Sequence, residues 1–339
     1  MIKGTTKLLG VIGHPVEHSL SPAMHNAAIS HLGVDFVYLP FPVKPEDLKA
    51  ALAGFAAIGV RGFSITIPHK QAILPLLSEV SPIARAIGAV NTVYLSDKGW
   101  CGTNTDVEGF LAPLQTGGFQ TFQSDSDPPR RAGTGAPPLQ RGENSLKVPL
   151  LKGDLGGSPG LTTPLGAGSD WSQKVAVILG NGGAARAVVA GCAQLRCAEI
   201  HVVGRSESNL AEFQQSWVNS PMPVQNLQVH TWDNLSSLIS QADLLVNTTP
   251  VGMYPQGEKS PVAAGEIDRI SAGAIVYDLI YTPNPTQFLK DAQLRGARAI
   301  DGLEMLVQQG AAALKIWLDK ESVPVDVMRQ ALQKHLGLS

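Results

Sequence analysis

A run of small residues that could bind phosphate begins at Gly180, directly after the apolar segment VAVIL. The letters GNGGAA fit the pattern G-x-G-x-x-A, with Ala185 in place of a third glycine. In this pattern the first glycine permits a tight turn, and the second, Gly182, lets the backbone approach a pyrophosphate. The free N–H groups and the dipole of a following helix attract phosphate as well. The motif indicates a dinucleotide-binding turn; the alternative is a glycine turn that only packs the helix.

The choice of dinucleotide depends on the end of the next predicted strand. An Asp or Glu about 20 residues after the glycines normally accepts the ribose hydroxyl of NAD. Here the strand ends in Val203, Gly204, Arg205 and Ser206. The guanidinium of Arg205 suits the extra phosphate of NADP, and Ser206 can add a hydrogen bond. We therefore predict NADP. NAD is the alternative, because Glu207 could accept a ribose hydroxyl. For Arg205 the structural alternative is a solvated side chain in a charged turn.

The N-terminal half carries polar residues at turns where packing alone does not require them. They lie in HSLSPAMHN, SITIPHK, GAVNTV and GTNTD. Each type has a commoner structural role, since a serine before proline or an aspartate before an apolar segment caps a helix, and a lysine is usually solvated. The presence of several such residues together in predicted loops favours a binding site. The residues are Ser19, Ser21, Thr66, Lys70, Asn91 and Asp106.

Alternating strand and helix patterns must position these residues, and they favour a parallel sheet with crossover helices over an antiparallel sandwich. Pro68 should end the third strand of the first half, which puts its neighbours where α/β sheets place ligands. The second half has the pattern of a nucleotide-binding fold. In the first half we predict strands over 7–12, 36–40 and 61–67 and helices over 22–31 and 45–57. In the second half we predict strands over 174–179, 199–203, 242–247 and 274–279, a helix from the glycine turn to about 195, and helices over 303–318 and 324–336.

Residues 116–170 differ in composition from the rest of the chain. They contain 7 Pro and 11 Gly among 55 residues, about a third, and their apolar residues show no sustained period. Such a segment is typical of a linker or a flexible insertion. A docking arm or lid is the functional alternative.

Charge and hydropathy exclude several classes of protein. A formal net charge of −2 with 16% charged residues gives no electrostatic case for nucleic acid or an anionic membrane as partner. The apolar runs are too short for a transmembrane helix, and residues 1–9 lack the pattern of a signal peptide, so we expect a cytoplasmic protein. Cys101, Cys192 and Cys197 show no metal-ligand spacing and are expected to be buried thiols, so we predict no metal.

The polar turns of the first half, followed in order by GNGGAAR, NTTPVGM, DLIYTPNPT and GLEMLVQQG, resemble the shikimate dehydrogenase family. The resemblance covers almost the whole chain outside residues 116–170. It implies an NADPH-dependent reduction of 3-dehydroshikimate to shikimate, in the pathway to chorismate and the aromatic amino acids. A small-molecule substrate is the partner it implies, and the sequence leaves a homodimer open.

The resemblance also implies roles for individual residues. A carboxylate set would hold the substrate carboxylate, and a hydroxyl set would hold its ring hydroxyls; hydroxyl and amide groups provide the donors and acceptors required. Gln309 is preferred over Gln308 because it occupies the glutamine position of the family's ML-x-x-Q run. The carboxylate set is Ser19, Ser21, Thr66 and Tyr281, and the hydroxyl set is Asn91, Asp106 and Gln309.

For catalysis the resemblance implies Lys70 and Asp106. An ammonium stabilises the charge that develops on the ketone oxygen and then supplies the proton, while the carboxylate orients the ammonium and the substrate hydroxyl. The implied cofactor contacts are Gly180, Asn181, Gly182, Gly183, Ala184, Gly204, Arg205, Ser206, Asn209, Leu279 and Gly302.

The chain departs from the family pattern in the 116–170 segment and at Gly204, where an asparagine is common. The fold class we predict is α/β, with an N-terminal α/β substrate domain, a Rossmann-type NADP-binding domain, and C-terminal helices that return to the first domain. The predicted boundaries are 1–115 for the substrate domain, 116–170 for the insertion, 171–300 for the NADP-binding domain and 301–339 for the returning helices. A quinate/shikimate dehydrogenase that uses NAD is the alternative function, and a redox-inactive nucleotide-binding module is a more distant one.

Overall fold

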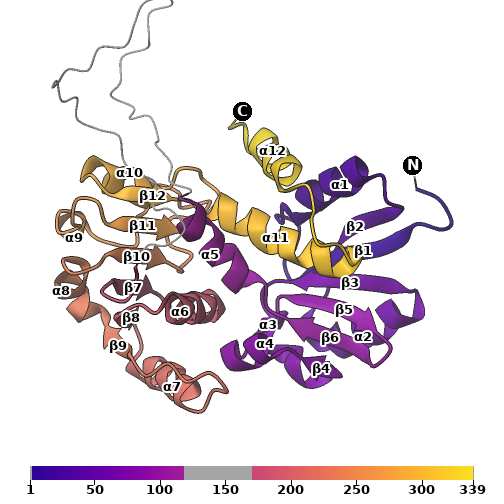
Figure 1. Ribbon diagram of the computed structural model, residues 1–339, viewed down its shortest axis with the longest axis horizontal. Helices are drawn as coiled ribbons and strands as arrows, with labels where there is room; N and C mark the ends of the chain where they lie inside the picture. The colour runs from indigo at the N-terminus through magenta and orange to yellow at the C-terminus, as the bar shows by residue number, and fades with distance from the viewer. Residues whose placement is uncertain (1, 118–169, 339) are drawn as a thin grey trace, which may run out of the picture.

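The structure is a computed structural model that describes residues 2–117 and 170–338. The predicted insertion therefore lies almost entirely outside the described residues. Two six-stranded sheets, A and B, form the two lobes of the molecule (Figure 1). Sheet A has the order β2-β1-β3-β5-β6-β4 and consists of β1 (Lys7–Gly13), β2 (Phe36–Pro42), β3 (Val60–Ile65), β4 (Glu79–Val80), β5 (Thr92–Ser96) and β6 (Gly99–Thr103). Sheet B has the order β12-β11-β10-β7-β8-β9 and consists of β7 (Val175–Leu179), β8 (Glu199–Gly204), β9 (Leu227–Thr231), β10 (Leu244–Asn247), β11 (Ile275–Asp278) and β12 (Arg298–Ile300).

Helices cover both sheets on both faces, which completes the predicted two-domain α/β architecture. Three short 3-10 helices, η1 (Pro45–Asp47), η2 (Leu74–Leu76) and η3 (Trp232–Asn234), join other elements. The α-helices are α1 (Ser21–Leu32), α2 (Leu48–Ala57), α3 (His69–Ala72), α4 (Pro82–Ile87), α5 (Asp106–Thr116), α6 (Gly183–Leu195), α7 (Glu207–Val218), α8 (Leu235–Ile239), α9 (Ala264–Ile267), α10 (Gln287–Leu294), α11 (Gly302–Leu318) and α12 (Val325–Leu336).

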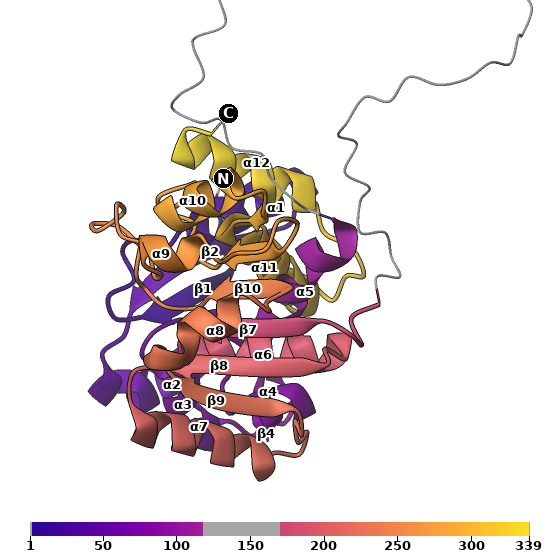
Figure 2. The same cartoon turned by 90° about the vertical axis from the view of Figure 1, so that its left-hand side faces the viewer.

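Sheet B is parallel throughout its described pairings, as the sequence predicts (Figure 2). The prediction is wrong for sheet A, which is mixed. There β1 pairs parallel with β2 and β3, but β5 pairs antiparallel with both β3 and β6. The β5–β6 hairpin turns through Asp97 and Lys98 to Gly99, whose φ of 105° lies in the left-handed region that glycine tolerates. A short connection of this kind joins antiparallel strands, whereas parallel strands need a long crossover.

The C-terminal helices return to the first lobe, as predicted. Trp317 of α11 packs against Gly62 of β3, where a side chain at residue 62 would overlap the indole ring. The indole Nε1 of Trp317 also donates to the carbonyl of Val93 at 2.9 Å. One buried cluster joins Leu9 and Val11 of β1 to α1, α11 and α12, so the last helices complete the core of sheet A.

Helices α5 and α11 lie between the two lobes and contact each other (Figure 1). Val107, Phe110 and Leu111 of α5 belong to the same buried cluster as Val188 of α6, on one face of sheet B. Helix α5 begins at Asp106, so the packing of α5 fixes a candidate catalytic residue at the junction of the lobes. All three cysteines are buried with free thiols, as expected.

No helix within residues 2–117 and 170–338 is both long enough and apolar enough to cross a bilayer.

Candidate functional site

A small cavity of 230 Å³ lies at the carboxyl ends of β1 and β3, between the two lobes. It gathers all the residues predicted for catalysis and substrate binding, although they come from positions far apart in the chain. Loops and the first turns of helices in the lobe of sheet A supply most of them, and the loop after β11 and helix α11 supply the rest. The predicted residues that line the cavity are Ser19, Ser21, Thr66, Lys70, Asn91, Asp106, Tyr281 and Gln309.

Lys70 and Asp106 form an ion pair at the wall of this cavity. The Nζ of Lys70 lies 2.7 Å from Oδ2 of Asp106, and the two side chains are 26% and 11% exposed. Lys70 is on the short helix α3, which follows the break at Pro68. Asp106 is the first residue of α5, where the positive end of the helix dipole favours a carboxylate. The N-cap residue is Thr105, so the capping role considered for Asp106 is not the one it has.

Asn91 holds the second oxygen of the Asp106 carboxylate. Its Nδ2 donates to Oδ1 of Asp106 at 2.8 Å, and its own Oδ1 accepts from the backbone N–H of Thr105 at 2.8 Å. The backbone N–H of Asp106 donates to Asn104 Oδ1 at 3.0 Å. These contacts are buried, so the carboxylate has a fixed orientation before any ligand arrives.

The carboxylate set approaches the cavity from both lobes. Ser19 and Ser21 lie at the start of α1, where Ser19 Oγ accepts from the N–H of Ser21 at 3.3 Å. The N-cap residue of α1 is Leu20, whose side chain makes no capping hydrogen bond, so the capping role considered for Ser21 is wrong. Tyr281 comes from the loop after β11, and burial raises the pKa of its phenol. A neutral phenol is therefore available there as a hydrogen-bond donor.

The two neighbouring glutamines of α11 have different surroundings. Gln309 lines the cavity, and its Nε2 donates to the carbonyl of Leu306 at 2.8 Å. Gln308 instead donates to Glu304 at 2.7 Å, and Glu304 is bound by Arg329 of α12. The geometry places Gln309, rather than Gln308, beside the other predicted residues.

The sequence analysis missed Ser64, which also lines the cavity. Its side chain is buried, and its Oγ has no hydrogen-bond partner among the described residues. Ser64 and Thr66 are two residues apart, so near the end of β3 both side chains lie on one face of the sheet. The alternation in SIT is the signal that could have identified Ser64.

The glycine turn has the geometry that a dinucleotide requires. Gly180 has a φ of 101°, and a Cβ there would come within 2.8 Å of Thr248 Oγ1. By contrast, a Cβ at Gly182 or Gly183 would meet no atom within 4 Å. The N-terminus of α6 therefore faces open space into which a pyrophosphate can approach closely.

The turn after β8 lies beside this glycine turn. A Cβ at Gly204 would come within 3.4 Å of Asn181 Cγ and 2.9 Å of Leu210 Cδ2, so the loop has little room for the family's asparagine without rearrangement. Ser206 is the N-cap of α7 and accepts from the N–H of Asn209 at 3.4 Å. Arg205 is exposed and has no ion-pair or hydrogen-bond partner within the described ranges.

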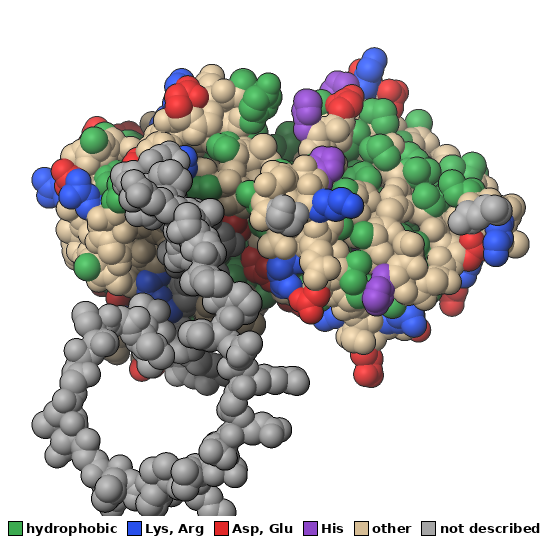
Figure 3. Space-filling view, turned by 90° about the horizontal axis from the view of Figure 1, so that it is seen from above, with side chains coloured by type: hydrophobic (Ala, Val, Ile, Leu, Met, Phe, Trp, Pro, Cys, Tyr) green, Lys and Arg blue, Asp and Glu red, His purple; other side chains and the backbone are tan. Residues whose placement is uncertain are grey.

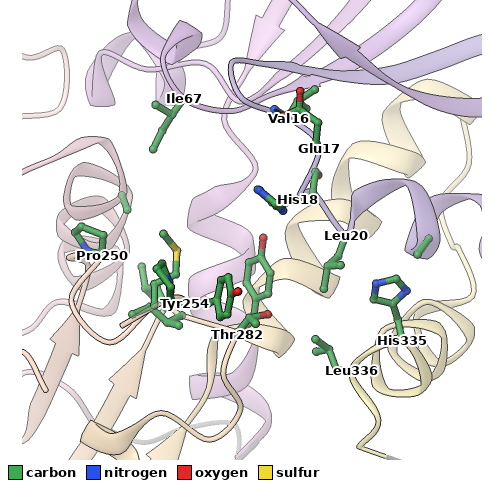
Figure 4. Close-up of a pocket in the computed structure, with 18 of the residues that line it drawn as sticks. Val16, Glu17, His18, Leu20, Ile67, Pro250, Tyr254, Thr282, His335 and Leu336 are labelled. Atoms are coloured by element: carbon green, nitrogen blue, oxygen red, sulfur yellow. Dashed lines mark hydrogen bonds between the residues drawn. The ribbon is translucent and has the colours of Figure 1, made fainter. Parts of the chain in front are cut away.

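A larger cleft of 1370 Å³ adjoins the small cavity (Figure 4). His18 and Ile67 line it from one lobe, and Pro250 and Tyr254 line it from the other. The cleft and the cavity share four lining residues, so they are continuous. From above, the molecule shows two lobes with a hollow between them (Figure 3). The shared residues are Ser19, Ala184, Leu279 and Tyr281.

Leu279 and Gly302 lie where the cavity meets the cleft. A side chain at residue 302 would overlap the carbonyl of Leu279, so only glycine permits this approach of α11 to the loop after β11. The N–H of Gly302 donates to the carbonyl of Ile280 at 3.2 Å. In the part of the chain that the structure describes, no three His, Cys, Asp or Glu side chains are grouped to hold a metal ion.

Two family models match the chain. The shikimate dehydrogenase substrate binding domain matches residues 11–93, and the shikimate 5'-dehydrogenase C-terminal domain matches residues 302–333. The first match runs from within β1 to the start of β5, and the second covers α11 with most of α12. Both contribute residues to the small cavity.

Known proteins are similar over the full length of the chain. The shikimate dehydrogenase (NADP(+)) of Trichormus variabilis is 60% identical over 338 residues, which cover 100% of both chains. A crystal structure of a shikimate dehydrogenase with NADP+ superposes with a TM-score of 0.75 at 32% identity, covering 99% of this chain and 98% of that one. The Thermus thermophilus enzyme, solved with NADP(H) and shikimate, has a TM-score of 0.73 at 28% identity and covers 97% of this chain and 99% of its own.

Proposed function

The chain belongs to the shikimate dehydrogenase family, and we propose that it catalyses the reversible NADPH-dependent reduction of 3-dehydroshikimate to shikimate. The observation that carries this proposal is the Lys70–Asp106 ion pair in a small cavity that opens onto a glycine-rich turn. In this arrangement Lys70, as a proton donor, lies close to the space in which a dinucleotide bound at the glycine-rich turn would place its nicotinamide. The reaction belongs to the pathway to chorismate and the aromatic amino acids.

Lys70 is the proton donor in this proposal. When a ketone is reduced its oxygen gains negative charge, and an ammonium within hydrogen-bond distance stabilises that charge and then transfers its proton to the oxygen. Asp106 keeps the ammonium in position through Oδ2 and presents its carboxylate to a neighbouring ring hydroxyl. Because Asn91 fixes the other oxygen of Asp106, the pair needs little reorganisation when substrate enters.

Substrate orientation comes from both lobes. The carboxylate set offers four hydroxyl donors, and each hydrogen bond to a carboxylate is strengthened by charge. In the hydroxyl set, the amides of Asn91 and Gln309 can both donate and accept, and the carboxylate of Asp106 accepts. Since Tyr281 comes from the loop after β11, the substrate contacts the second lobe as well as the first, and closure of the two lobes excludes water during hydride transfer.

The cofactor in this proposal is NADP, which supplies the hydride when bound. Residues 180–184 hold its pyrophosphate, supported by the open space at Gly182 and Gly183. Arg205, exposed and without a partner among the described residues, pairs with the additional phosphate, and Ser206 and Asn209 complete that loop. Leu279 and Gly302 contact the nicotinamide end, next to the small cavity.

A cytoplasmic location and a homodimer belong to the proposal on the basis of the sequence alone. Size-exclusion chromatography with light scattering measures the oligomeric state, and a mass of one chain excludes the homodimer.

A single assay tests the function: reduction of NADP and of NAD, followed at 340 nm, with shikimate and with quinate as substrates. The proposal expects the highest kcat/KM with shikimate and NADP. Faster turnover of quinate with NAD would replace it by a quinate/shikimate dehydrogenase. Absence of turnover with every pair would leave a redox-inactive nucleotide-binding module, provided that NADPH still binds.

A further inference from the structure

A buried carboxyl group lies behind the wall of the cavity, and neither the sequence motifs nor the proposed mechanism assigns it a role. Asp278 is the last residue of β11 and is 0% exposed. Its Oδ1 accepts from Asn247 Nδ2 at 2.9 Å and from the N–H of Ile280 at 3.1 Å, and its Oδ2 accepts from Thr286 Oγ1 at 2.7 Å. Three neutral donors thus converge on a carboxyl group that has no cationic partner in the described part of the chain.

The partners of Asp278 belong to the segments that line the cavity and the cleft. Ile280 lies between Leu279 and Tyr281, which line both spaces. The carbonyl of Ile280 accepts from the N–H of Gly302 at 3.2 Å, so the same short loop also holds the start of α11. A shift of Ile280 would therefore move residues of the cleft and of the cavity together.

Asn247 extends the connection to the neighbouring strand. It is the last residue of β10, and its Oδ1 accepts from the N–H and the Oγ1 of Thr249 at 3.0 and 2.7 Å. Thr249 lines the cleft opposite the loops of sheet A. Through Asn247 the carboxyl of Asp278 fixes the loop after β10 relative to the loop after β11.

We propose that Asp278 is a positioning residue that holds the loop of Leu279, at the nicotinamide wall, and Tyr281, which faces the substrate, in place relative to β10 and α11. The proposal rests on the function proposed above and adds a residue that touches neither ligand. Two acceptor oxygens are needed because three donors meet at one point, and a methyl group in place of the carboxyl would leave all three unsatisfied in a buried site. The loop would then satisfy them by moving.

The experiment compares Asp278→Ala with a matched control at the other end of β10. Asp243 lies immediately before β10, and its carboxylate accepts from Lys174 Nζ at 2.8 Å and from the N–H of Val175 at 2.9 Å, away from both cavities. Asp243→Ala therefore removes a hydrogen-bonded carboxylate from the same sheet without touching either cavity. For each variant we would measure Tm, kcat, the KM for shikimate, and the dissociation constant of NADPH from its fluorescence.

Displacement of the loop that carries Leu279 and Tyr281 should lower kcat/KM, because a misplacement of reacting groups by about 1 Å lowers the rate on the order of 10²-fold. We expect Asp278→Ala to raise the KM for shikimate and the NADPH dissociation constant each by roughly 10-fold and to lower kcat as well. Asp278→Asn retains the acceptor for Ile280 and Asn247 and should restore both constants to within about 3-fold of wild type. Asp243→Ala should lower Tm and leave both constants unchanged.

A purely structural role gives another pattern, since loss of folded protein lowers the apparent kcat and leaves KM unchanged. Unchanged constants in folded Asp278→Ala overturn the proposal. If that variant does not fold, Asn247→Ala decides, because it breaks the link to Thr249 and should weaken NADPH binding; wild-type binding in that variant also overturns the proposal. NADPH binding is independent of turnover, so failure of the wild type to oxidise shikimate would count only against the proposed function.

Discussion

Gly109 of α5 lies directly against Gln309 of α11. A Cβ at Gly109 would come within 2.9 Å of the Cβ of Gln309 and within 2.7 Å of the carbonyl oxygen of Met305. Two helices that are far apart in the chain therefore approach each other at this glycine, where a side chain would force them apart. One of them begins at Asp106 and the other carries Gln309, so the contact sets the width of the cavity.

Gly109→Ala should separate α5 from α11. Overpacking of this kind costs about 1–3 kcal/mol, and the displaced Gln309 should raise the KM for shikimate several-fold. Gly10→Ala on β1 is the control, because a Cβ there would come within 2.2 Å of Phe41 Cε2, and neither residue lines the cavity. It should lower Tm to a similar extent without changing KM. Equal KM values in the two variants would show that the α5–α11 contact does not set the substrate site.

Lys70→Ala should lower kcat by roughly 10² to 10⁴-fold with a much smaller change in the KM for shikimate, the range expected for loss of a general acid. Lys98→Ala is the matched control, since Lys98 pairs with Glu79 at 3.1 Å but is 75% exposed. It should retain full activity. Steady-state kinetics of both variants decides the role, and near wild-type kcat in Lys70→Ala excludes Lys70 as proton donor.

Gly182→Ala should weaken NADPH binding without destabilising the protein. The φ of −85° at Gly182 is accessible to alanine, and its Cβ would meet no protein atom within 4 Å, so only a ligand would contact the new methyl group. Gly54→Ala on α2 has equally open surroundings and should leave binding unchanged. Thermal unfolding with and without NADPH measures both effects. A wild-type shift in Tm with NADPH in Gly182→Ala would place the pyrophosphate elsewhere.

Arg205→Ala should reduce the preference for NADP over NAD. A charge-assisted hydrogen-bond pair to the phosphate is lost with NADP and is absent with NAD, so kcat/KM with NADP should fall by about 10-fold to 100-fold while that with NAD changes little. Arg269, also exposed and in the same lobe, provides the control substitution Arg269→Ala. An equal fall with both cofactors would assign Arg205 a role other than phosphate recognition.

Asp278 should make stability depend on pH. Burial raises the pKa of Asp278 from 3.8 to about 7. The folded protein then binds this proton more tightly than the unfolded chain. The stability that the protonated carboxyl contributes is therefore fully present below pH 3.8 and is lost as the pH rises to about 7. Asp278→Asn does not titrate. Between pH 5 and pH 8 the free energy of unfolding of wild type should fall by about 3 kcal/mol relative to this variant, as measured by urea unfolding. A constant difference would contradict the raised pKa.

The sequence predicts the strands of sheet B well because each is a short apolar run closed by a polar turn. Strand 242–247 appears as Leu244–Asn247 and strand 274–279 as Ile275–Asp278. It also predicts the returning helices, since small and apolar residues recur at helical spacing over 303–318. The predicted helix 45–57 is correct only in its second part, because Pro45–Asp47 forms a 3-10 turn before α2.

The direction of strand pairing was not predictable from local pattern. Thr92–Ser96 and Gly99–Thr103 mix polar and apolar residues, so neither strand stands out as an apolar run. The polar turns beside them were interpreted as parts of a binding site and not as the ends of a hairpin. The buried link between Asn247 and Asp278 was missed for a related reason. It joins residues 31 positions apart that each open a quoted motif at the end of a strand, and their contact becomes evident once the strands are known to be neighbours.

The return of α11 to the first lobe has a consequence for synthesis on the ribosome. The buried face of sheet A around Leu9 and Val11 stays exposed until residues 302–318 leave the exit tunnel, because α11 forms part of its cover. The glycine turn of residues 180–184 leaves the tunnel earlier, whereas Gln309 completes the small cavity only when α11 follows. The small cavity is therefore completed after the glycine turn has been synthesised.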